Sequence, residues 1–83
     1  MDGGLWFDWD VHNVGHLARH DVQPAEVEQA LSGEIVDLDY RVTEDGEERW
    51  TAMGQTTAGH LLVIVWTILD DGSYRPIYGL PGY

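Results

Sequence analysis

Apolar and polar residues follow a helical spacing up to Gly33 and an alternating spacing after it. Before the helical part, the alternating residues LWFDWD (5–10) predict a short strand. A first helix is then expected over residues 11–20. A second is expected in QPAEVEQAL (23–31), because proline favours the first turn of a helix and the following glycine favours its end. The side of the first helix that carries Val11, Val14 and Ala18, with Leu17 and Gly15 flanking them, is expected to pack on a sheet.

Four strands are expected in the rest of the chain. The residues IVDLDYRV (35–42) alternate strictly, which predicts a strand covered on one face only. After the turn EDGEE, RWTAMG predicts a second strand, and the longer apolar run HLLVIVWTIL (60–69) predicts a central one. The turn DDGS leads into YRPIYGL, where Pro76 has no amide hydrogen to donate. This last strand is therefore expected at a sheet edge or with a bulge.

The order of these elements predicts an α+β fold, with two N-terminal helices packed on a mainly antiparallel sheet of four to five strands. The chain has 83 residues, which suits one domain over residues 1–83 with one compact core. Residues 61–69 are expected at the centre of the sheet. Six residues from both layers are expected in the core: Val14, Val27, Leu38, Trp50, Val63 and Val65.

The charge of the chain is strongly negative. Fifteen acidic residues stand against four arginines and no lysine, giving a net charge of −11. Such a chain repels RNA and anionic membranes unless its cations lie on one face. The charge suits a basic partner protein, and it equally suits a merely solubilising surface. The absence of cysteine excludes disulfides and cysteine nucleophiles. No signal peptide or membrane span is recognisable, so a cytoplasmic location is expected.

Three of the four histidines are spaced four residues apart, at His12, His16 and His20. On a helix they form a ladder along the side away from the expected sheet contacts. The ladder could be a solvated surface, or a strip in which imidazole acts as an acid, a base or a phosphate contact. A metal site is the least favoured reading, because no motif for further ligands is visible. We therefore expect no bound metal or other cofactor.

Several motifs occur in an order that resembles one known family. They are FDWD, ARHDV, P.EVEQAL, GEERW.AMGQT, GHLLVIVWT and YRPIYG. Together they resemble the BrnT-type toxins of bacterial toxin–antitoxin operons, over about residues 5–80. The resemblance implies a RelE-like fold and a ribonuclease that cleaves messenger RNA without a metal. It also implies neutralisation by a ribbon-helix-helix antitoxin, and the acidic charge suits a basic one. A domain this small, with four tryptophans and four tyrosines, leaves aromatic surface for a partner, so we expect a homodimer or a heteromer with that antitoxin.

The resemblance also implies four catalytic residues. The motif ARHDV maps the family histidine onto His20, and His16 falls where many members have asparagine. Arg49 matches the arginine of GEER, and Arg75 matches the first arginine of the terminal motif. The histidines would then act as base and acid, and the arginines would hold the phosphate. However, the second terminal arginine, needed for toxicity in the family, is Leu80 here, and the sequence ends before the family's C-terminal helix. The alternative is a non-catalytic protein-interaction module that keeps the fold.

Overall fold

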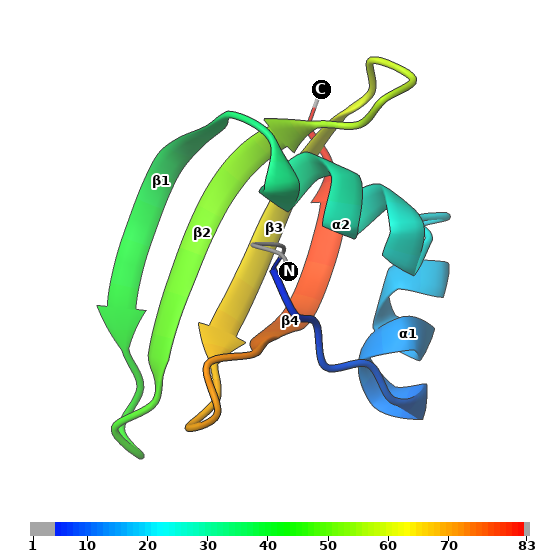
Figure 1. Ribbon diagram of the computed structural model, residues 1–83. Coiled ribbons are helices and arrows are strands. Elements are labelled where there is room, and N and C mark those ends of the chain that lie inside the picture. The colour runs from blue at the N-terminus through cyan, green and yellow to red at the C-terminus, as the bar shows by residue number, and fades with distance from the viewer. Residues whose placement is uncertain (1–4, 83) are drawn as a thin grey trace.

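The computed structural model describes residues 5–82, which form two helices and four strands (Figure 1). The strands make one antiparallel sheet in the order β1-β2-β3-β4. The expected α+β fold, with both helices before the strands, is confirmed. Neither helix is long and apolar enough to cross a membrane. The elements are α1 (Val11–Ala18), α2 (Pro24–Ser32), β1 (Ile35–Val42), β2 (Glu48–Gln55), β3 (Leu61–Ile68) and β4 (Tyr74–Pro81).

Helix α1 begins with a reciprocal pair of hydrogen bonds between Asp10 and Asn13. The Asp10 carboxylate accepts the Asn13 backbone N–H at 3.1 Å, and the Asn13 side-chain oxygen accepts the Asp10 backbone N–H at 2.8 Å. The Asn13 side-chain nitrogen also donates to the backbone carbonyls of Asp8 and Pro76, at 2.9 and 3.0 Å. Asn13 therefore caps the helix and fastens it to β4 at the same time.

This cap sets which side of α1 faces the sheet. The buried residues of α1 are Asn13 and Leu17. The expectation is wrong for Val11, Val14 and Ala18, which are exposed, whereas Leu17, expected at the flank of the packing side, is fully buried. The helix also ends at Ala18, two residues earlier than expected. Val14 is thus not a core residue, because the polar contacts of Asn13 determine the rotation of the helix.

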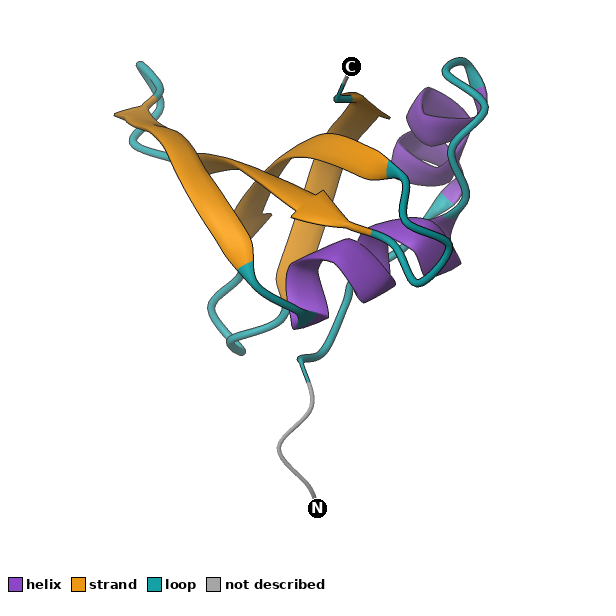
Figure 2. Ribbon diagram, turned by 90° about the horizontal axis from the view of Figure 1, so that it is seen from above, coloured by secondary structure: helices purple, strands orange, loops and turns teal. Residues whose placement is uncertain are grey.

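Both helices pack on the same face of the sheet (Figure 2). Two glycines allow this close approach. A Cβ at Gly54 of β2 would lie 2.5 Å from the backbone oxygen of Ala30 in α2. A Cβ at Gly79 of β4 would lie 3.2 Å from a methyl group of Leu17 in α1. The core between the layers consists of Leu17, Val22, Val27, Ala30, Leu31, Ala52, Leu62, Ile64 and Trp66.

The helical layer does not extend over β1. All eight residues of β1 are exposed, so the expectation of one covered face is wrong for this strand. Leu38, expected in the core, is 50% exposed because α2 packs mainly on β2 and β3. Val27 and Val65 are buried, as expected. The other two expected core residues, Trp50 and Val63, are half-buried.

The segment before α1 runs beside the start of β4. It forms a single parallel bridge between Phe7 and Tyr74, so the strand expected over residues 5–10 is wrong apart from that bridge. Aromatic rings hold it in place, since Phe7 contacts Tyr74 and Tyr74 stacks on Trp66. In addition, the indole N–H of Trp9 donates to the Glu28 carboxylate of α2 at 2.7 Å.

Two expectations for the last strands are confirmed. β3 lies inside the sheet between β2 and β4. β4 is an edge strand, and its register with β3 shifts where Val65 pairs with Tyr78 and Trp66 pairs with Pro76. This bulge accommodates the proline, which cannot donate to the ladder.

Candidate functional site

The histidine ladder lies on the surface. His12, His16 and His20 are all exposed, as their spacing predicted, although His20 lies just beyond the end of α1. Within residues 5–82, no group of three or more His, Asp or Glu side chains is placed to hold a metal ion. The imidazoles are therefore accessible to solvent and to any ligand that approaches this side of the molecule.

Two of the four expected catalytic residues share a shallow groove between α1 and β4. His16 and Arg75 both line it, together with His12, Asn13, Pro76 and Ile77. Its volume is about 130 Å³. Imidazole and guanidinium thus lie close enough to contact one ligand, but the state of Arg75 decides whether an anion can bind.

Arg75 is held by two carboxylates. Its Nη1 lies 2.6 Å from Asp8 Oδ2, and its Nη2 lies 2.9 Å from Asp10 Oδ2. The hydrogen bond to Asp8, together with the weaker effect of the hydrogen bond to Asp10, raises the pKa of Arg75 above its ordinary value. One positive and two negative charges make this cluster repel a phosphate. These ion pairs tie the N-terminal segment and the cap of α1 to β4.

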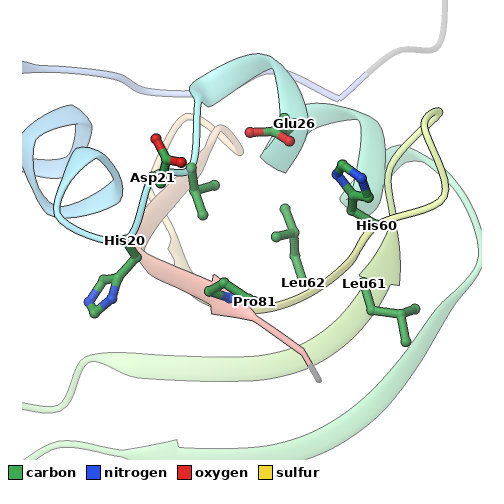
Figure 3. A pocket seen from close by; sticks show the side chains of 8 residues that line it. His20, Asp21, Glu26, His60, Leu61, Leu62 and Pro81 are labelled. Carbon is green, nitrogen blue, oxygen red and sulfur yellow. The ribbon is translucent and has the colours of Figure 1, made fainter.

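A larger cavity contains His20 and a histidine that the sequence analysis did not single out (Figure 3). It has a volume of about 380 Å³ and lies between the residues after α1, the first turn of α2 and the start of β3. Apolar side chains form one part of its wall, and four titratable residues form the other. These four are His20, Asp21, Glu26 and His60.

The two histidines of this cavity come from sequence positions forty residues apart. They lie on opposite sides of it, with the His20 ring turned outward in Figure 3. His60 has a fixed backbone, because its N–H donates to the Thr56 hydroxyl at 3.0 Å and its carbonyl accepts the Thr56 N–H at 2.8 Å. The exposed His20 side chain can change rotamer on a fast timescale and so turn toward a ligand.

His60 could have been noticed in the sequence from its position. It is a polar residue directly before the apolar run LLVIVW, and so at the N-terminal end of the predicted central strand. However, only the packing of β3 against α2 brings it near His20. Two imidazoles beside one cavity can supply both a base and an acid near neutral pH.

Arg49 lies on the other side of the sheet. Its neighbours in β2, Trp50 and Ala52, point toward the helical layer and pack in or against the core. Because side chains alternate along a strand, Arg49 points away from the helices. It lines a hollow of about 190 Å³ with Arg41 and Tyr78, among others. The four expected residues thus occupy three places: His16 with Arg75, His20 with His60, and Arg49 with Arg41.

The fold is a small α+β domain whose imidazole and guanidinium side chains line three separate hollows. The family model of BrnT, the ribonuclease toxin of type II toxin–antitoxin systems, matches residues 9–78. The chain therefore belongs to the BrnT toxin family, which also implies an antitoxin partner. Searches of curated proteins and of solved structures found no match.

Proposed function

We propose that this toxin cleaves messenger RNA, without a metal ion, in the cavity between His20 and His60. The observation that carries this proposal is that the fold brings these two imidazoles to opposite sides of one cavity. His16, Arg49 and Arg75 line other surfaces, so the proposal assigns the proton transfers to His20 and His60.

The reaction needs one neutral and one protonated imidazole. The neutral ring removes the proton of a ribose 2′-hydroxyl, and the freed oxygen attacks the adjacent phosphorus. The bond from phosphorus to the 5′-oxygen then breaks, and the protonated ring donates its proton to that oxygen. The products are a 2′,3′-cyclic phosphate and a 5′-hydroxyl. No redox partner or cofactor takes part in these steps.

The wall of the cavity suits part of a nucleotide. Its volume of about 380 Å³ is in the range of small-ligand sites. Leu62 and Val22 are buried and offer an apolar surface to a base or ribose. Asp21 and Glu26 also line the cavity, and their negative charge repels a phosphate. We therefore expect RNA affinity to depend on contacts outside the cavity.

Cleavage of RNA in the presence of EDTA tests the proposal. We expect purified toxin to cut RNA with EDTA present and to leave 2′,3′-cyclic phosphate ends. His20→Ala and His60→Ala should each abolish cleavage with little change in melting temperature, since both side chains are exposed. His12→Ala is the matched control and should cut normally. Activity that EDTA removes and a divalent cation restores would contradict the metal-free mechanism.

We propose that the partner is a basic ribbon-helix-helix antitoxin and that the toxin acts in the cytoplasm. The net charge of −11 and the exposed apolar residues of β1, such as Val36 and Leu38, support a basic protein partner. We expect a homodimer or a heteromer with the antitoxin. Sedimentation that shows only monomer at high concentration, with and without the antitoxin, would contradict this.

A second candidate function is a non-catalytic member that binds its antitoxin but cuts no RNA. It is favoured by the lining of the histidine cavity, where the described residues include two carboxylates and no arginine. Leu80 in place of the family arginine favours it as well. Wild-type protein that binds the antitoxin, yet neither slows growth nor cuts RNA, would establish this function.

A further inference from the structure

We infer that the helix-side face of β1 is a docking surface for a basic protein, and that a hollow in this surface receives an arginine or lysine side chain of that protein. The hollow has a volume of about 430 Å³ and is lined by Asp37, Leu38, Asp39, Tyr40 and Trp50. The cationic side chain follows from the chemistry of this lining, whereas the choice of the antitoxin as its carrier rests on the proposed function.

The first support is that β1 presents apolar side chains beside α2, which packs mainly on β2 and β3 (Figure 1). In the sheet register Asp37 is opposite Ala52, and Tyr40 is opposite Trp50. Because Ala52 is in the core and Trp50 packs against it, the side chains opposite them also point to the helical side. The exposed apolar residues of β1 on this face are Ile35, Tyr40 and Val42.

The second support is the aromatic wall of the hollow. The ring centroids of Tyr40 and Trp50 are 5.5 Å apart, with their planes at 49°. The Tyr40 hydroxyl donates to the Glu48 carboxylate at 2.6 Å, and this bond raises the pKa of Tyr40, so its ring is held and stays neutral. Trp50 in turn stacks on the buried Trp66. Two aromatic rings held in this way attract a guanidinium or ammonium group to their faces.

The third support is a carboxylate in the same hollow. Asp39 is paired with Arg41 at 2.9 Å. Within residues 5–82, by contrast, the structure shows no ion pair or hydrogen bond of the Asp37 carboxylate, which also lines the hollow. An arginine or lysine that enters can therefore lay its apolar stem along the rings and place its charge beside Asp37.

The fourth support is that two other occupants are disfavoured. A strand added to the edge of β1 would meet an interrupted ladder, because the register with β2 shifts between Asp37 and Asp39, and such bulges protect edge strands from pairing. A second copy of the chain would bring a further net charge of −11 to the surface and be repelled. The same charge attracts a basic protein, so a basic partner that docks through its side chains fits this surface.

The first test uses the full chain and N-acetyl-arginine amide as the probe, with the neutral N-acetyl-citrulline amide as a control of the same shape. Binding is followed by the shift of the Trp50 indole N–H resonance. We expect only the arginine probe to bind, and Asp37→Asn and Tyr40→Ala each to weaken it roughly two- to fivefold. Asp45→Asn is the matched control, because it removes an exposed carboxylate in the turn after β1, and it should bind as wild type does.

The second test measures the affinity of the proposed antitoxin, produced from the gene next to this one. We expect Asp37→Asn and Tyr40→Ala each to weaken the complex roughly three- to tenfold, more than they weaken the probe, because a docked protein excludes water from the charge pair. Asp45→Asn should form the complex as wild type does. The melting temperatures of the free variants should change little, since Asp37 and Tyr40 are exposed.

Equal binding of the two probes, no binding of either, or an equal loss in Asp45→Asn and Asp37→Asn would overturn the cation site. If the antitoxin binds all variants equally, the docking surface is wrong even where the arginine probe binds. An antitoxin that does not bind wild type contradicts the proposed partner, while the probe still judges the hollow and the cleavage assay judges the ribonuclease. Self-association of wild type that Tyr40→Ala abolishes would make a second copy the occupant and overturn the basic partner.

Discussion

Replacing Asn13 by alanine should destabilise the protein more than any change at an exposed position of α1. The Asn13 side chain makes three hydrogen bonds, to the carbonyls of Asp8 and Pro76 and from the N–H of Asp10. Asn13 is only 3% exposed, so water does not readily replace these hydrogen bonds. At about 1 kcal/mol each, the loss is about 3 kcal/mol of unfolding free energy. For a domain of this size, the melting temperature should fall by roughly 12–24 °C.

Chemical denaturation followed by tryptophan fluorescence measures this loss, and Val14→Ala is the matched control. Val14 is 37% exposed, so its truncation should cost less than about 1 kcal/mol. The comparison tests the rotation of α1 directly, because apolar patterning alone assigns the buried position to Val14. A larger loss in Val14→Ala than in Asn13→Ala would refute the observed orientation of the helix and the reasoning built on it.

Two further predictions concern packing and pH. Gly54→Ala should lower the free energy of unfolding by about 1–3 kcal/mol, because its Cβ would lie 2.5 Å from the Ala30 backbone oxygen. In contrast, the Cβ of Gly15→Ala would meet nothing within 4 Å, so this change should stabilise α1 by up to about 1 kcal/mol. Thermal melts of both variants check the opposite signs. The Asn13 backbone N–H, with Arg75, lowers the pKa of Asp10 below its ordinary 3.8. Asp10 therefore contributes stability that is present above the unfolded pKa and is lost as pH falls through the folded one, and Asp10→Asn should flatten the acid limb of a stability–pH curve.

The order of the elements could be predicted because each one has a local signal. Pro24 and Gly33 mark the ends of α2, and the apolar run after His60 marks an interior strand. The rotation of α1 could not be predicted in the same way. It depends on a hydrogen bond from Asn13 to Pro76, 63 residues away, and a polar residue gives no apolar pattern to follow. The local signal of Val14 was therefore overridden by a long-range contact.

The candidate site shows the same division between local and long-range information. The exposure of His12 and His16 followed from helical spacing, and the edge position of β4 followed from Pro76. The sequence could not show which candidate side chains lie next to each other, because the sheet register determines their neighbours. That register places Arg49 beside Arg41, while the packing of β3 and α2 places His60 at the cavity of His20. Motifs identify chemically useful side chains, but they do not give the partner of each one.

The placement of the arginines limits how an acidic toxin of this kind can act on RNA. A net charge of −11 opposes binding, and the described lining of the histidine cavity has no arginine to offset it. Arg75 is already held by two carboxylates, whereas Arg19, next to His20, is exposed and Arg41 and Arg49 line a hollow on the opposite sheet face. Under the proposed cleavage at the histidines, an RNA strand that also contacts Arg41 and Arg49 must reach from one side of the sheet to the other. A substrate too short to span both places should therefore be cut much more slowly than a long one.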